Sequence, residues 1–120
     1  MKYVILIYQG STPTPDDPEA WAALPQEDKQ AMYQDYQALS ELPGYQPGTA
    51  MEGPAQATTV RVQDGRTLTT DGPFAEVKDA IGGYFTVEAD DLDAAIAIAA
   101  RVPAARLGGA IEIRPARSGY

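Results

Sequence analysis

The chain has 120 residues, no cysteine, no histidine and a formal net charge of −8. This length fits one domain with a core of its own. The missing cysteines exclude disulfides and thiolate nucleophiles, and the missing histidines exclude Ser-His-Asp and Cys-His triads. Any chemistry must therefore use carboxylates, tyrosines, lysines, arginines or the backbone, and we expect no metal site and no cofactor.

The acidic balance argues against nucleic acid as a partner, because a negative surface repels phosphate backbones. No stretch approaches the roughly 20 apolar residues of a membrane span, so we expect no membrane partner. The apolar run at residues 3–8 lies at the short end for a signal peptide, and no small-residue cleavage site follows it. We therefore expect a cytoplasmic protein.

Residues 3–8 are apolar at every position and predict a buried strand. Because side chains alternate along a strand, they form two apolar sets that point in opposite directions. The two sets are Tyr3, Ile5 and Ile7, and Val4, Leu6 and Tyr8. A strand that is apolar on both faces is expected to be covered on both faces.

A proline-rich loop over residues 9–18 leads into a short helix, which Asp17 is expected to cap. A longer helix is predicted from Pro25 to about Leu42, where Pro43-Gly44 stops it. Its apolar stripe follows helical spacing: Met32, Tyr36 and Leu39.

The middle of the chain reads as strands. A short edge strand is expected near residues 49–52, followed by a hairpin over residues 58–70. Asp64-Gly65 between alternating segments is the preferred two-residue turn. Another strand is predicted from Ala80 to Glu88.

The acidic run at residues 90–93 caps a further helix, which Pro103 ends, and residues 110–114 form the last strand. The expected buried stripe of this helix is Leu92, Ile96, Ala99 and Val102. The order β-α-β-hairpin-β-α-β predicts an α+β fold, a ferredoxin-like split βαβ sandwich with an extra hairpin. We expect a single domain over residues 1–120.

Two helices cover only one face of such a sheet. The first strand and residues 84–87 are nevertheless apolar on both faces, and monomers rarely tolerate a bare apolar face. We therefore expect a homodimer in which two sheets pack face to face around a shared interior, a dimeric α/β barrel.

Five segments together carry a resemblance to a known family: 2–8, 57–61, 71–76 (Asp-Gly-Pro-Phe-Ala-Glu), 82–84 and 103–106. In this order they resemble the YCII-related family and, more narrowly, its branch named for the DGPF motif. The resemblance covers nearly the whole chain and implies a ferredoxin-like, dimeric α/β-barrel fold.

The resemblance implies little about activity. Smaller relatives are suspected enzymes with a histidine–aspartate pair, of which only Asp71 has a counterpart in this chain. Some members of the branch are encoded near extracytoplasmic-function sigma factors, which implies a regulatory setting.

Asp71 is the first candidate site residue. It follows a strand and precedes Gly72-Pro73, which holds the carboxylate on a rigid corner. The functional interpretation is a general base or ligand anchor at a cleft rim, and the alternative is an Asx turn in which the carboxylate bonds its own backbone. Phe74 is expected to anchor the corner in the core and is a weak candidate for ligand contact.

Tyr8 and Tyr84 are the candidate phenols. If their strands are adjacent, both would line the barrel interior, where a phenol hydrogen-bonds an oxygenated ligand or acts as an acid. The alternative is a pair of core tyrosines whose hydroxyls are satisfied by the protein.

Three charged residues are weaker candidates for ligand binding. Glu52 would form an acid–base couple with Asp71 if the two carboxylates are close. Lys78 would hold an anionic ligand, unless it is a solvated surface lysine. Arg106 would bind an anion, or would fix the last strand through an ion pair with Asp71 or Glu112.

Three functions remain open from sequence. The first is a homodimer that binds a small organic ligand near the DGPF loop, as a cofactor-free enzyme that moves protons through Asp71 and a tyrosine. The second is a non-catalytic ligand sensor or accessory protein in a regulatory, sigma-factor-linked setting. The third is a subunit-interaction module with a filled interior.

Overall fold

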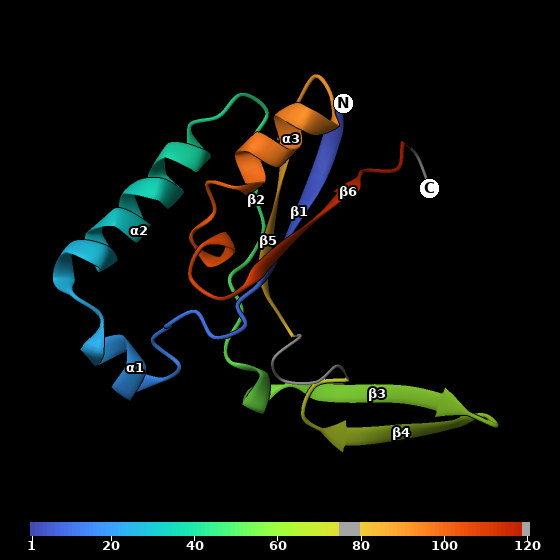
Figure 1. The fold of residues 1–120 in the computed structure, drawn as a ribbon. Coiled ribbons are helices and arrows are strands. Elements are labelled where there is room, and N and C mark those ends of the chain that lie inside the picture. Colours follow the sequence, from blue (N-terminus) through green and yellow to red (C-terminus); the bar gives the residue numbers. More distant parts are fainter. Residues whose placement is uncertain (75–79, 119–120) are drawn as a thin grey trace.

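The computed structural model describes residues 1–74 and 80–118 (Figure 1). Its helices and strands follow the predicted order closely. In chain order they are β1 (Lys2–Tyr8), α1 (Pro18–Ala23), α2 (Gln26–Ser40), β2 (Gln46–Pro47), β3 (Thr58–Gln63), β4 (Arg66–Asp71), β5 (Ile81–Glu88), α3 (Leu92–Ala99) and β6 (Ala110–Pro115). Short 3₁₀ turns occur at Pro54–Gln56 and Pro103–Ala105.

Four strands form one sheet in the order β2-β5-β1-β6, and each neighbouring pair is antiparallel. β1 and β2 therefore run parallel with β5 inserted between them, which is the split βαβ arrangement. The α+β, ferredoxin-like prediction agrees with this topology. The remaining strands, β3 and β4, pair only with each other.

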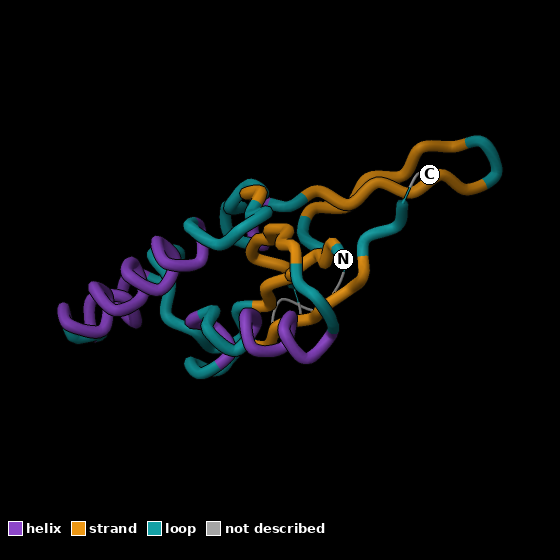
Figure 2. The backbone as a smooth tube through the Cα atoms, turned by 90° about the horizontal axis from the view of Figure 1, so that it is seen from above, coloured by secondary structure: helices purple, strands orange, loops and turns teal. Residues whose placement is uncertain are grey.

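The helices lie on one side of the four-stranded sheet, and the β3–β4 hairpin projects to the other side (Figure 2). The core forms between the sheet and the helices. Its largest fully buried side chains are Ile5, Leu39, Val87, Val102 and Pro103. One predicted set of β1, Tyr3, Ile5 and Ile7, is buried in this core, whereas the opposite set is only half-buried.

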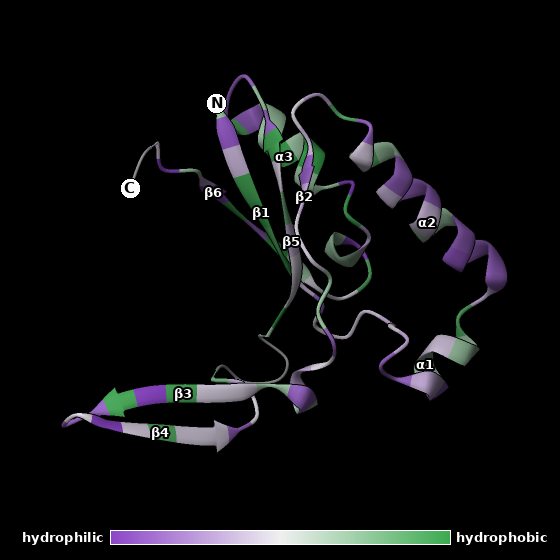
Figure 3. Ribbon diagram, turned by 180° about the vertical axis from the view of Figure 1, so that it is seen from behind, coloured by the Kyte–Doolittle hydropathy of each residue, from purple (hydrophilic) through white to green (hydrophobic). Residues whose placement is uncertain are grey.

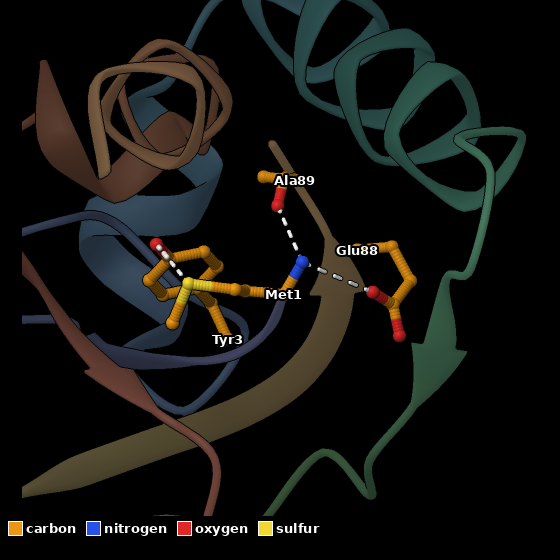
Figure 4. A network of polar contacts seen from close by, with 4 residues as sticks. All are labelled: Met1, Tyr3, Glu88 and Ala89. Atoms are coloured by element: carbon orange, nitrogen blue, oxygen red, sulfur yellow. Dashed lines mark hydrogen bonds and ion pairs between the residues drawn. The ribbon is translucent and has the colours of Figure 1, made fainter. Parts of the chain in front are cut away.

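The N-terminal end of β1 is fastened to the end of β5 (Figure 4). The amino group of Met1 donates to the carbonyl of Ala89 at 2.8 Å and lies 3.6 Å from a carboxylate oxygen of Glu88. The amide of Ala89 donates back to the carbonyl of Met1 at 2.9 Å. These contacts extend the β1–β5 pairing beyond the strands themselves.

The predicted helix caps are confirmed. Asp17 accepts a hydrogen bond from the amide of Ala20 at 3.2 Å, and Asp91 accepts one from the amide of Ala94 at 2.9 Å. Each carboxylate satisfies a backbone donor that has no partner within its helix.

The predicted buried stripe of α3 is partly wrong. Leu92 and Ile96 are 53% and 49% exposed, whereas Ala95 and Ala99 are buried and Val102 follows them into the core. The helix turns its small alanines toward the sheet, because small side chains let it pack close to the strands. Leu92 and Ile96 therefore point outward, whereas Ile98 is partly buried against the core.

The hairpin turn is confirmed and the edge strand is displaced. Asp64 and Gly65 both have positive φ angles, 51° and 75°, as the predicted two-residue turn requires. The regular edge strand is β2, at residues 46–47 rather than 49–52. The chain still follows β5 irregularly after β2, because the amides of Gly48 and Met51 donate to β5 carbonyls at 3.1 and 3.2 Å.

Candidate functional site

A groove of about 510 Å³ opens where the end of β1 meets the start of β5. One wall comes from the segment before β3, and another comes from the Asp-Gly-Pro-Phe corner (residues 71–74). The lining includes Tyr8, Met51, Glu52, Ala57, Pro73 and Ile81. Most of the lining side chains are apolar, so Tyr8, Glu52 and Gln56, which also lines the groove, stand out as groups that can hydrogen-bond a bound molecule.

Two short hydrogen bonds, which we call the latch, connect the Asp-Gly-Pro-Phe corner (residues 71–74) to the base of the hairpin. The amide of Gly72 donates to the carbonyl of Ala57, and the hydroxyl of Thr59 donates to the carbonyl of Gly72, both at 2.7 Å. Gly72 has a φ of 104°, a conformation that favours glycine. The latch brings Pro73 into the groove wall next to Ala57.

Tyr8 is positioned by the end of β1. The β1–β5 register shifts between Ile7 and Tyr8, so the strand is irregular at the groove. The Tyr8 hydroxyl donates to Glu112 Oε1 at 3.4 Å, and Arg114 Nε lies 3.0 Å from the other carboxylate oxygen of Glu112. The hydroxyl proton is used in this chain of contacts, so the phenol oxygen offers its lone pairs to a ligand.

Asp71 lies beside the groove rather than in its described lining. It is the exposed last residue of β4, and it pairs with Thr58 across the hairpin. Among residues 1–74 and 80–118 its carboxylate has no hydrogen-bond partner, so no Asx turn forms within this described part of the chain. Pro73 also lacks the N–H that an Asx turn would use two residues after Asp71.

Tyr84 lies on the same face of the sheet as Tyr8, but it does not line the groove. Their strands are adjacent, since β5 pairs with β1 and Tyr84 lies opposite Leu6. Tyr84 is 43% exposed, and its ring packs over Gly48. Both phenols therefore belong to the sheet face that the helices leave open.

The expectation that Phe74 anchors the corner in the core is wrong. Phe74 is 80% exposed, and the guanidinium of Arg61 lies 5.9 Å from the centre of its ring. The hairpin and its corner project from the domain, so no core is within reach of this ring. Lys78, the other candidate near the corner, lies outside the described residues.

The expected partners of Arg106 are also wrong. Its guanidinium pairs with Asp35 of α2 at 2.5 Å, not with Asp71 or Glu112. Arg106 follows the 3₁₀ turn at Pro103–Ala105, so the pair ties that turn to the long helix. It does not line the groove, and nothing in its geometry brings it to the other candidates.

The sequence did not predict which residues form the walls of the groove. Met51, Ala57, Pro73 and Ile81 are ordinary apolar residues with no chemical motif of their own. The available signal was the glycine- and proline-rich run between the long helix and the hairpin, which is typical of a chain that bends around a site rather than forming a regular strand.

Fold and groove together define a ferredoxin-like α+β domain with an apolar groove at one end of its sheet. The chain matches the YCII-related domain over residues 1–118 and therefore belongs to the YCII-related family. It is also 30% identical to an uncharacterised protein of Rhizobium meliloti (strain 1021), over 96% of this chain and 91% of that protein. Within the described residues, no helix has the length and apolar character needed to cross a bilayer.

Proposed function

We propose that this YCII-related domain binds a small organic molecule in the groove beside the Asp-Gly-Pro-Phe corner. The groove itself carries the proposal, because about 510 Å³ falls within the range of roughly 300–1,000 Å³ typical of small-molecule sites. Its mostly apolar walls and few polar groups are also typical of such sites. Tyr8 and Glu52 would orient the ligand.

The catalytic form of the proposal uses carboxylates, in a cofactor-free acid–base reaction. Glu52 lines the groove, and Asp71 lies two residues from Pro73 in its wall. We assign Asp71 the role of general base at the rim, with Glu52, Tyr8 and Gln56 as polar groups that face the ligand. A non-catalytic sensor would keep the groove but would not need Asp71.

We propose in addition that the working unit is a homodimer in which a second copy covers the open sheet face. Three observations support a second copy of the chain as the molecule that covers this face. Val4, Leu6 and Tyr8 are only half-buried on that face. The radius of gyration is 16.2 Å, against about 14 Å for a compact domain of this length. Finally, an isolated two-stranded hairpin is marginally stable in water, so the projecting hairpin needs a surface to pack on.

The hairpin also has side chains suited to such contact. Val60, Val62 and Leu68 are exposed hydrophobic residues on β3 and β4. Figure 3 shows hydrophobic positions on both strands of this arm. Val60 and Val62 share one face of the arm, and Leu68, opposite Arg61, lies on the other face. A second copy that packs against the Val60 and Val62 face and against the open sheet face would bury both of these apolar surfaces.

A fragment screen tests the groove directly. The probes are monocyclic aromatic acids, phenols, amines and lactones, followed by ligand-observed NMR. We expect some probes to bind with dissociation constants below about 1 mM. The Ala57→Trp variant, whose larger side chain fills the groove, should weaken the binding of these probes about tenfold or more. Met51→Trp is the second groove-filling variant, should Ala57→Trp fail to fold.

Ala97→Trp is the matched control, because Ala97 is exposed on α3 and does not line the groove. It should bind the same probes as the native chain. The proposal fails if no probe binds, or if the groove-filling variants bind as well as this control.

Asp71→Asn separates the enzyme from the sensor. For a probe that the protein converts, we expect turnover to fall about a hundredfold or more while its affinity stays the same. Asp64→Asn at the hairpin tip is the control with the same chemical change. Unchanged turnover in Asp71→Asn would remove the catalytic role of this residue.

A further inference from the structure

The groove does not end at Glu52. A second groove of about 400 Å³ adjoins it, between the loop that follows β1 and the start of β5. The two grooves share a stretch of wall that includes Met51, Glu52, Pro54 and Ile81. A molecule of moderate length can therefore extend from the first groove into the second and pass Glu52.

The second groove differs from the first in charge. Asp16, Asp17 and Glu52 line it, and no lysine or arginine lines either groove among the described residues. A Cβ atom at Gly53 would lie 3.3 Å from the carboxyl carbon of Asp16, so this carboxylate lies directly against the shared wall.

Asp17 is already occupied as the cap of α1, because it accepts a hydrogen bond from the amide of Ala20. Asp16 and Glu52 make no hydrogen bond or ion pair with any other side chain in the described part of the chain. Two exposed carboxylates, which have no cationic partner among residues 1–74 and 80–118, thus line one groove.

A second observation points to a polar ligand at this end. Thr12 lines the second groove and is only 7% exposed, yet its hydroxyl oxygen has no hydrogen-bond partner among the described residues. A buried hydroxyl is normally satisfied, and leaving it unpaired is costly. The oxygen is itself covered by neighbouring atoms, so a proton-donating ligand group at this end of the groove, or a water held beside it, would satisfy it once the covering atoms shift.

We infer that the ligand is an organic cation, with an apolar body in the first groove and a protonated amine in the second groove between Asp16 and Glu52. The inference rests on the proposed ligand groove and specifies which chemical class it takes. Tyr8 fits the same class, since its hydroxyl proton is donated to Glu112 and its oxygen can accept a hydrogen bond from the ligand. A carboxylic acid would meet two carboxylates and no described cation.

Three probes with one carbon skeleton test the class: 2-phenylethylammonium, 2-phenylethanol and phenylacetate. Their affinities are measured by protein-observed NMR or calorimetry at neutral pH, at low and at high salt. We expect the ammonium to bind about tenfold more tightly than the alcohol, and the carboxylate to bind most weakly. The preference for the ammonium should shrink at high salt, because salt screens the attraction.

Glu52→Gln and Asp16→Asn remove one charge each with little change of shape. Each should reduce the preference for the ammonium about threefold or more and leave the affinity for the alcohol nearly unchanged. Glu41→Gln is the control, because it removes one exposed carboxylate at the end of α2, away from both grooves.

The outcomes separate this inference from the proposed function. If the ammonium binds no better than the alcohol, or does not bind, the inference is overturned. In that case, the proposed ligand groove would still be supported if Ala57→Trp weakens the binding of the probes. If no compound binds here or in the fragment screen, both proposals fail together.

Discussion

The two faces of the four-stranded sheet differ sharply although the same strands build them. Alternation along β1 sends Tyr3, Ile5 and Ile7 into the core, where helix residues cover them. The opposite face of the same strand carries Val4, Leu6 and Tyr8, which nothing in the described chain covers fully. One face therefore holds the fold together, while the other stays only partly covered by the described chain.

The largest effect is expected on the covered face. Ile5 is completely buried, so Ile5→Ala removes packed side-chain volume and should lower the free energy of unfolding by about 3 kcal/mol. Val4→Ala, one residue away on the open face, is the matched comparison and should cost about 1 kcal/mol or less in dilute protein. Urea denaturation measures both, and equal losses would mean that the two faces are packed alike.

The next effect belongs to the open face. Leu6→Glu places a charge where we propose that a second copy packs, and it should weaken association about a hundredfold with little change in the circular dichroism spectrum. Tyr33→Glu introduces the same charge on the exposed surface of α2 and should leave association unchanged. Sedimentation velocity over a range of concentrations measures both variants. Unaltered association in Leu6→Glu would place the interface elsewhere.

A smaller effect on stability is expected from the helix caps, because α3 packs against the core and α1 does not. Asp91 caps α3, which buries Ala95 and Ala99, so Asp91→Ala should lower the free energy of unfolding by about 1 kcal/mol. Asp17 caps α1, which has no buried residue, so Asp17→Ala should cost only a few tenths of that amount. Thermal denaturation of the two variants compares them, and a larger loss in Asp17→Ala would contradict the assignment of the core.

The smallest effect is a dependence on alkaline pH. Burial raises the pKa of Tyr36 above its usual 10.0, and nearby Tyr45 raises this pKa further. Above pH 10 the unfolded chain loses the Tyr36 proton more readily than the folded chain does. Stability that is fully present below pH 10 is therefore lost as the pH rises toward the higher folded-state pKa.

Tyr36→Phe should therefore make the loss of stability above pH 10 less steep than in the native chain. Tyr33→Phe, at an exposed tyrosine of the same helix, should follow the native curve. The same slope in native protein and Tyr36→Phe would remove Tyr36 as a source of the pH dependence.

Local chemistry explains which features could be predicted from the sequence. The two faces of β1, the Asp64-Gly65 turn and the caps at Asp17 and Asp91 each depend on residues close in the chain. The YCII-related family was likewise recognised from short segments in a fixed order, and the comparison confirms it.

The features that escaped prediction depend on where whole elements lie. Phe74 is exposed because the hairpin projects from the domain, and Arg106 meets Asp35 because the turn after α3 approaches α2. The face that α3 turns to the sheet depends on how closely the helix packs, not on which of its residues are most hydrophobic. Pro73 reaches the groove wall through a latch to Ala57, which no local pattern shows.

The central claim is that the open face is the interior of a two-chain unit. Sedimentation equilibrium of the native protein at micromolar concentration tests it most directly, because this measurement gives the mass of the particle in solution. The account predicts the mass of two chains. The mass of one chain across the micromolar range would contradict it, and the open face would then be exposed to solvent.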